Sequence, residues 1–323
     1  MSHPQLDSLP ERARTALRDL DIHGVGLEIG PSYNPIAPRS AGFDIRILDH
    51  SSRTGLVDKY RAAGLSQTEL GRIEEVDYIW TGGPITDVIP ADQRFDFIVA
   101  AHVIEHTTDV IGFLRAATDL LAPGGVLSLI VPDKRYCFDR LRPLTTAGQV
   151  VEAHLLPSTF HGPAAFIDTH LYSVRNNGAE MVWDRNTALH LQLAQCSWDD
   201  ARHTIERTVD SDEYNDIHRW VFTPTSLELL LSDLYHLGFT DMRLASLAQN
   251  NSFEFFATLA KADLAPDNAG LVANDYRAEL LARMTREESA VTMPAGREPV
   301  DAYLARRSRQ VRDRARAMLA RRS

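Results

Sequence analysis

The sequence predicts an α/β fold in which a doubly wound, mainly parallel sheet of seven strands carries helices on both faces. Two observations predict it. Helical patterns, most clearly at 111–121, separate several short apolar runs, which lie at 25–30, 44–49, 75–79, 95–101 and 125–131. Runs that are apolar at nearly every position are typical of strands buried on both faces, which is the environment of a parallel sheet.

The remaining elements complete this pattern. A short amphipathic helix is expected at 10–20, because Pro10 stands in its first turn and apolar residues recur at helical spacing. A second helix is expected from Thr223, whose side chain suits a helix start. Two further strands, near 241–245 and 253–260, would close the sheet.

The composition excludes several classes of protein. The chain of 323 residues has a net charge of −10, which argues against nucleic acid as the main partner because phosphate contacts need a basic surface. No run approaches the roughly 20 apolar residues of a membrane helix, and the first residues lack the apolar core of a secretory signal. We therefore expect a cytoplasmic protein with no membrane span, in which Cys137 and Cys196 are reduced thiols. Eight arginines between Arg306 and Arg322 indicate a solvated helix, the alternative being a contact with an anionic partner.

The first expected strand ends in the most informative motif, Glu28-Ile-Gly30-Pro31-Ser32-Tyr33-Asn34. It resembles motif I of class I S-adenosylmethionine-dependent methyltransferases, acidic-x-Gly-x-Gly-x-Gly, with serine and asparagine at the last two glycine positions. In that family the loop approaches the methionyl part of the cofactor and the acidic residue orients it. The resemblance implies S-adenosylmethionine as cofactor, with Glu28, Gly30, Pro31 and Asn34 at its site. Asn34 tolerates a left-handed backbone, which keeps such a turn feasible. The G-x-G-x-x-G spacing of dinucleotide-binding folds is absent.

The ends of the next two strands suggest contacts to the nucleoside. Asp49 ends the second strand, 21 residues after Glu28, where a carboxylate can bind both ribose hydroxyls. After the third strand, Trp80 and Thr81 fall where the family often has an acidic residue at the adenine amine. Thr81 departs from that pattern, so we expect adenine to rest on stacking and backbone groups, with Asp77 as a weaker candidate.

The fourth strand runs into His102-Val-Ile-Glu105-His106. The spelling H-x-x-E-H occurs in zinc peptidases, but that site needs both histidines on one face of an established helix and a third ligand. The same letters at a strand-to-helix junction are common in methyltransferases, so we expect no metal. Ala101 and His102 are then expected to line the cofactor, and Glu105 and His106 to open the next helix, with Glu105 as a capping residue or a catalytic one.

The candidate catalytic residues follow the strands. Pro-Gly-Gly at 123–125 before the fifth strand is a frequent methyltransferase feature, and Asp133 lies at that strand's carboxyl end, where open α/β sheets bind ligands. A sugar hydroxyl needs a base, and His218 and His106 are the first candidates. His218 stands out because Asp216 and Trp220 surround it.

These signals divide the chain into four parts. Residues 1–139 are expected to form a Rossmann-like cofactor-binding core, and 140–219, polar and rich in histidine with no convincing strand, a helical insertion over the acceptor. Residues 220–262 complete the sheet, and 263–323 form a helical, arginine-rich tail.

The methyltransferase resemblance covers 24–135 and 220–262. Two pieces, at 132–136 and 216–224, look like a bacterial branch associated with glycan and cell-envelope biosynthesis, which implies O-methylation of a sugar hydroxyl in a glycan or glycosylated metabolite. The alternatives are methylation of another small molecule on oxygen or nitrogen, and a non-catalytic cofactor-binding partner of another enzyme. A homo-oligomer stays open.

Overall fold

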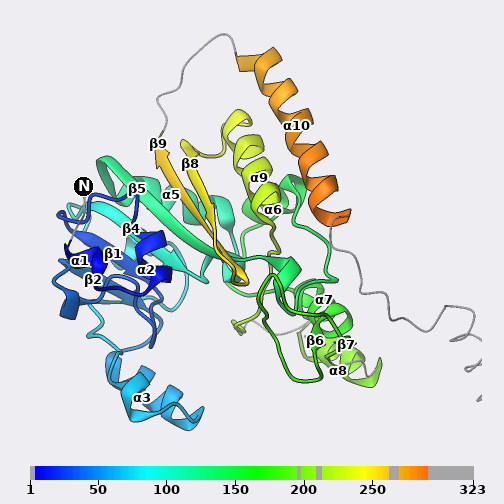
Figure 1. Ribbon diagram of the computed structural model, residues 1–323, viewed down its shortest axis with the longest axis horizontal. Helices are drawn as coiled ribbons and strands as arrows, with labels where there is room; N and C mark the ends of the chain where they lie inside the picture. The colour runs from blue at the N-terminus through cyan, green and yellow to red at the C-terminus, as the bar shows by residue number, and fades with distance from the viewer. Residues whose placement is uncertain (1–3, 195–197, 209–212, 262–268, 290–323) are drawn as a thin grey trace, which may run out of the picture.

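A computed structural model describes residues 4–194, 198–208, 213–261 and 269–289 (Figure 1). Its main sheet has seven strands in the order β3-β2-β1-β4-β5-β9-β8. The strands are β1 (Gly26–Ile29), β2 (Ile45–Asp49), β3 (Tyr78–Ile79), β4 (Phe95–Ala101), β5 (Leu121–Pro132), β8 (Met242–Gln249) and β9 (Glu254–Lys261). The predicted α/β fold with a seven-stranded, doubly wound sheet is confirmed.

The strand directions place a ligand site. Strands β1 to β5 run parallel, whereas β9 pairs antiparallel with β5 and with β8. The chain proceeds outward from β1 through β2 to β3 and then returns to the other side of β1 as β4. Open α/β sheets bind ligands at such a reversal, outside the carboxyl ends of the strands.

The fifth strand begins earlier than the sequence suggested. Phe95 pairs with Leu121 and Phe97 with Val126, so the Pro-Gly-Gly segment lies within β5 as an irregularity. Regular pairing resumes at Val126, after Gly124 with a left-handed φ of 82°.

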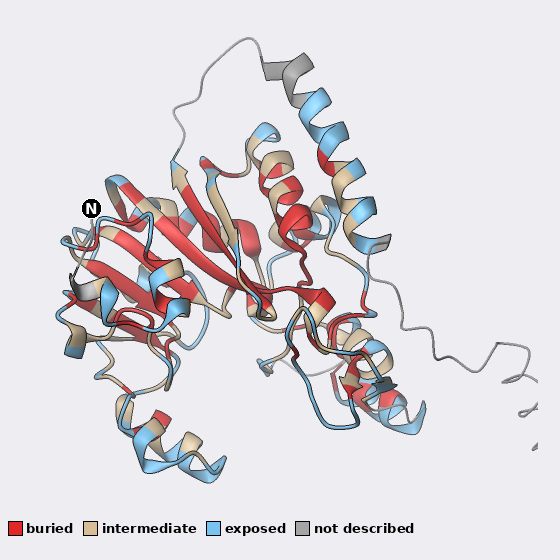
Figure 2. Cartoon of the chain, viewed as in Figure 1, coloured by how far each residue is buried: buried red, intermediate tan, exposed pale blue. Residues whose placement is uncertain are grey.

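Helices cover the two faces unequally. Helix α5 (Val110–Leu120), α6 (Ala147–Leu155) and α9 (Pro224–His236) bury apolar side chains on one face, and α2 (Glu11–Ala16) packs on the other. Figure 2 shows the buried residues concentrated on the central strands and α9. Helix α10 (Ala269–Ser289) lies along the outer side of α9 and is exposed over much of its length. Further helices lie before β4, namely α1 (Pro4–Asp7), α3 (Arg53–Ala62) and α4 (Gln67–Leu70).

The segment 140–219 is not wholly helical, which corrects the expectation of no strand there. Besides α6, it forms α7 (Pro163–Tyr172), α8 (Trp198–Thr208) and a small antiparallel pair, β6 (Val174–Asn176) with β7 (Leu191–Leu193). Each strand has three residues, too few to show an alternating pattern. The pair depends on a buried side chain, since Asn176 Oδ1 accepts a hydrogen bond from the His190 amide.

Among the described residues, no helix combines the length and apolar character needed to cross a membrane. The arginine-rich stretch 306–322 and Cys196 lie outside the described residues. Cys137 is a free, buried thiol whose pKa is raised by its burial.

Candidate active site

A cavity of about 1220 Å³ opens at the carboxyl ends of β1, β2 and β4. One part of its wall is made by the loops that follow these strands. The other part is made by residues beyond β4 and by the segment 140–219, namely His106, Thr107, Thr108, Asp109, Pro157, Ser158, Thr159, Phe160, Tyr214 and Asp216. The two parts are called here the strand-loop end and the acceptor end.

The loop after β1 is shaped from below by Glu28. Its carboxylate is buried and accepts hydrogen bonds from the amides of Ile36, at 2.6 Å, and Ala37, at 3.1 Å. Burial raises the pKa of Glu28 to about 7, although these hydrogen bonds act to lower it. Glu28 does not line the cavity, so it orients the loop and makes no wall contact.

The backbone of this loop fits a close-lying ligand. Gly30, Pro31, Ser32 and Asn34 line the cavity, and Gly30 adopts a left-handed φ of 65°. The second left-handed residue is Ser32, at 50°, and not Asn34 as expected. Ser32 is held there because its amide donates to Asp49 Oδ2 at 3.0 Å. Asp49 belongs to the neighbouring strand β2, so the sequence of the loop alone does not reveal this contact.

Asp49 lines the cavity from the end of β2. The sequence suggested an exposed strand-end carboxylate, but Asp49 is only 2% exposed. Its oxygens accept hydrogen bonds from the amides of Ser32 and His50, the latter at 2.7 Å. The residue therefore anchors the loop after β1 as well as facing the cavity.

The loop after β3 contributes Trp80 and Thr81 to the cavity wall. Asp77, the other candidate for adenine, does not line the cavity. Its carboxylate pairs with Arg39 and accepts a hydrogen bond from the Ile47 amide at 2.7 Å, so it fixes the edge of the sheet.

Ala101 and His102, at the end of β4, both line the cavity, as expected. His102 has a left-handed φ of 54° and lies between two carboxylates. Its Nε2 is 2.7 Å from Glu254 Oε1, and its Nδ1 is 3.2 Å from Glu105 Oε1. Burial acts to lower the pKa of His102, but the two carboxylates raise it to about 9. Glu254 also accepts from Arg12 Nε at 2.9 Å, so two partly exposed cations and two buried carboxylates form one chain of ion pairs.

Beyond β4 the backbone forms a short 3₁₀ turn, Ile104–His106, and not the start of a helix. Helix α5 begins at Val110, and its cap is Asp109, whose side chain accepts from the Gly112 amide at 2.9 Å. The expected capping role of Glu105 is therefore wrong. Glu105 is fully buried beneath this turn.

Of the two candidate bases, only His106 lines the cavity. Its Nδ1 lies 2.9 Å from Asp216 Oδ1. Burial acts to lower the pKa of His106, and Asp216 and Glu105 raise it. His106 holds the pKa of Asp216 down to about 2.

His218 lies behind His106 and does not line the cavity, which corrects its expected position at the acceptor. The two rings meet edge to face with centroids 4.6 Å apart. His218 Nδ1 is 2.5 Å from Asp139 Oδ2, and Arg142 donates to the other oxygen of Asp139 at 2.8 Å. Burial acts to raise the pKa of Asp139, but His218 and Arg142 outweigh it and lower this pKa.

Asp133, the third candidate catalytic residue, is also not at the cavity. It is completely buried, and Arg135 binds it in a bidentate manner at 2.8 and 2.6 Å. Arg185, from the segment 140–219, approaches the same carboxylate at 3.3 Å. These ion pairs hold that segment to the end of β5, so the structure gives Asp133 a structural position.

Several wall residues carry no signal in the sequence. Arg12 comes from α2 and Tyr60 from α3. Residues 157–160 lie between α6 and α7, and Tyr214 follows α8. No local motif surrounds them. Only the packing of distant segments places them around the cavity.

Comparison with known proteins shows the family of the chain. A family model described as a methyltransferase domain matches residues 16–234, which is more than half of the chain. The chain belongs to the methyltransferase domain family. S-adenosylmethionine is the cofactor of this methyltransferase. The strand-loop end fits it for two reasons. Gly30 has no side chain, so a ligand can approach its backbone closely; a Cβ added there would lie 3.4 Å from Val103. Asp49 presents a carboxylate to the same cavity.

Solved structures resemble the methyltransferase in fold only. The CcbJ methyltransferase from Streptomyces caelestis shares 15% identity over 81% of this chain and 94% of that chain, with a TM-score of 0.41. A glycopeptide N-methyltransferase, MtfA, complexed with sinefungin, shares 12% over 78% and 93%, with a TM-score of 0.36. A SAM-dependent methyltransferase from Aquifex aeolicus shares 12% over 80% and 94%, with a TM-score of 0.38. No curated protein matches the chain significantly.

Proposed function

We propose that this methyltransferase methylates a hydroxyl oxygen of a sugar, in a glycan or a glycosylated small molecule. The observation that carries the proposal is the position of His106. Backed by Asp216, its imidazole stands in the wall of the cavity that also contains Gly30 and Asp49. A methyl donor and a proton-accepting group would therefore share one enclosed space.

The chemistry favours a hydroxyl acceptor at such a site. S-adenosylmethionine supplies a methyl group on a sulfonium sulfur, and transfer to oxygen breaks a C–S bond, forms a C–O bond and releases the hydroxyl proton. A neutral amine can attack with its lone pair, whereas a sugar hydroxyl is a poor nucleophile until its proton is removed. A well-placed acid–base group contributes about 10²–10⁴-fold to such a step. His106 would accept the proton of the sugar hydroxyl, and His218 together with Asp139 would position the His106 ring.

The rest of the acceptor end supports a polar, hydroxylated substrate. Thr107, Ser158, Thr159 and Tyr214 bring hydroxyl groups to the wall, and Phe160 adds an aromatic ring. Hydrogen-bonding groups placed around an aromatic surface suit the two faces of a sugar ring. The resemblance of 132–136 and 216–224 to a glycan-associated bacterial branch supports the same acceptor class.

We assign the segment 140–219 to acceptor selection. Its residues 157–160, 214 and 216 form part of the cavity wall. The cofactor loops come from other parts of the chain. Changes in this segment would then alter the acceptor without altering cofactor binding.

Extracts of cells with and without the gene would test the proposal. Mass spectrometry should reveal a saccharide-containing compound that lacks one methyl group in the deletion strain. The purified protein, supplied with that compound and isotopically labelled S-adenosylmethionine, should place the label on oxygen. A label on nitrogen would overturn the acceptor assignment, and cofactor binding without turnover on this compound would favour a non-catalytic partner protein.

A further inference from the structure

Glu105 is a fully buried carboxylate that the described residues satisfy only in part. The residue is fully buried, and neither carboxylate oxygen accepts a hydrogen bond from any residue that the structure describes. The nearest group is His102, whose Nδ1 lies 3.2 Å from Oε1 and which is shared with Glu254. Removing a carboxylate from water is costly unless it is paired or binds a metal. Oε1 has the ion pair with His102, and among the described residues Oε2 has no hydrogen-bond donor, so the carboxylate can accept a further positive partner.

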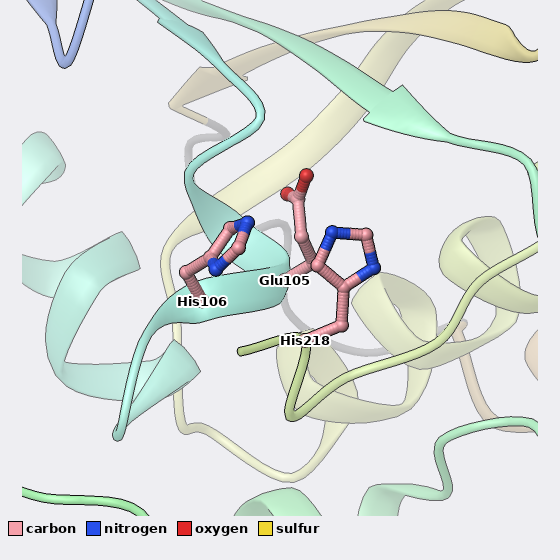
Figure 3. A group of neighbouring side chains, drawn as sticks. All are labelled: Glu105, His106 and His218. Carbon is pink, nitrogen blue, oxygen red and sulfur yellow. The ribbon is translucent and has the colours of Figure 1, made fainter. Parts of the chain in front are cut away.

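Two imidazoles converge on this carboxylate. Glu105 and His106 are neighbours on one turn, and His218 reaches them from a separate segment, with its ring turned toward the Glu105 carboxylate (Figure 3). Each of the three side chains offers one ligand atom, and these atoms lie within 4.8 Å of one another. A small adjustment of side chains would bring them to metal–ligand distances of about 2.0–2.2 Å.

A second layer of carboxylates already orients the imidazoles. His218 Nδ1 is paired with Asp139, which leaves Nε2 free on the side of Glu105. Asp216 lies beside Nδ1 of His106. A carboxylate on the far nitrogen of a histidine fixes its tautomer and is the usual support of a metal ligand.

We infer that Glu105, His106 and His218 bind a divalent transition-metal ion, of the kind represented by Zn²⁺, Mn²⁺ or Co²⁺. Two imidazole nitrogens and one carboxylate suit these ions, whereas Mg²⁺ and Ca²⁺ prefer oxygen ligands. The set differs from the one that the H-x-x-E-H spelling suggests, because His102 is engaged by Glu254 and Glu105 and His218 takes its place.

The position of the ligands indicates an open site. Glu105 and His218 lie behind the wall, and His106 lines the cavity, so an ion between them would be reached from the acceptor end. Three protein ligands with one position free are typical of catalytic metal sites. This inference rests on the proposed function and replaces the role of His106 as the base. The ion would bind the acceptor oxygen and lower the pKa of the hydroxyl, whose proton would pass to water in the open cavity, and His106 would hold the ion.

Titration of the full chain with Co²⁺ tests the site directly. The protein would be purified without a histidine tag and stripped with a chelator, and visible d–d absorption and calorimetry would be followed. We expect one ion per chain. Glu105→Gln and His218→Ala should each weaken binding at least tenfold, and His236→Ala, a change at an exposed histidine of α9, should leave it unchanged.

His106→Gln serves as a further variant if either change prevents folding. Absence of saturable binding, or binding that is equal in all variants, would overturn the inference. Activity separates it from the proposed function. If chelator-treated protein methylates the acceptor at the full rate, the metal site is wrong and the proposed function stands. If Co²⁺ binds as expected but no hydroxylated acceptor is methylated, the metal site stands and the proposed function is wrong.

Discussion

The two ends of the cavity are built in different ways. Most of the strand-loop end comes from residues that follow β1, β2, β3 and β4, so each of these is placed by the strand before it; Arg12 and Tyr60 are added by helices. The acceptor end joins a turn after β4, the residues 157–160 and the stretch that contains Tyr214 and Asp216. Its parts meet through side-chain contacts and not through a shared sheet.

The difference shows where charge is stabilised. At the strand-loop end, backbone amides satisfy the carboxylates of Glu28 and Asp49. At the acceptor end, side chains from distant segments pair with one another, as in His106 with Asp216 and His218 with Asp139. A change at one end should therefore leave the other nearly intact. Three of four predictions test this separation, and the remaining one concerns a buried charge outside both ends.

The largest effect is expected at Asp133, which belongs to neither end. Asp133→Ala would leave the Arg135 and Arg185 guanidinium groups without their buried partner, and breaking such a pair costs about 3–5 kcal/mol. The free energy of unfolding, from denaturant titration, should fall by this amount, and turnover per folded molecule should stay at the wild-type level. Asp133→Asn is the milder variant should the alanine protein not fold. A loss of turnover at unchanged stability would return Asp133 to the active site.

His106→Ala should break the acceptor end alone. Because His106 is the imidazole that faces the cavity, we expect kcat to fall by about a hundredfold or more, the scale of a lost acid–base group. Calorimetric affinity for S-adenosylmethionine should be unchanged. His236→Ala is the matched control at an exposed position. A parallel loss of cofactor affinity would contradict the separation of the two ends.

Asp49→Asn should act on the strand-loop end. A hydrogen bond to a charged group is worth about 1.5–3 kcal/mol, so affinity for S-adenosylmethionine should weaken at least about tenfold. The Tm should also drop, because Asp49 holds the Ser32 and His50 amides. Asp44→Asn, at an exposed aspartate just before the same strand, should change neither quantity. Unchanged affinity in the Asp49 variant would remove this residue from the cofactor site.

The smallest effect is expected at Tyr214, whose hydroxyl donates to the His106 carbonyl oxygen at 3.2 Å. Tyr214→Phe removes one partly exposed hydrogen bond, worth about 0.5–1.5 kcal/mol, so the KM for the acceptor should rise by about two- to tenfold. Steady-state kinetics at saturating cofactor would measure it. A change in the KM for S-adenosylmethionine, with that for the acceptor constant, would place Tyr214 at the wrong end.

The sequence by itself determined the fold and most of the strand-loop end. Apolar runs identify buried strands, and the carboxyl ends of parallel strands must meet at one edge, so residues such as Gly30, Asp49 and Ala101 could be brought together without coordinates. The same logic failed where a strand is too short to show a period, as in β6 and β7, each of three residues.

Only the tertiary structure decided which charged residues face the cavity. Asp77 precedes β3 and pairs with Arg39, whereas Asp133 follows β5 and pairs with Arg135 and Arg185. The meeting of Glu105 with His218, more than a hundred positions apart, was equally hidden. The physical reason is that burial follows local periodicity, whereas the role of a charge depends on the partner that folding brings to it, and that partner can lie anywhere in the chain.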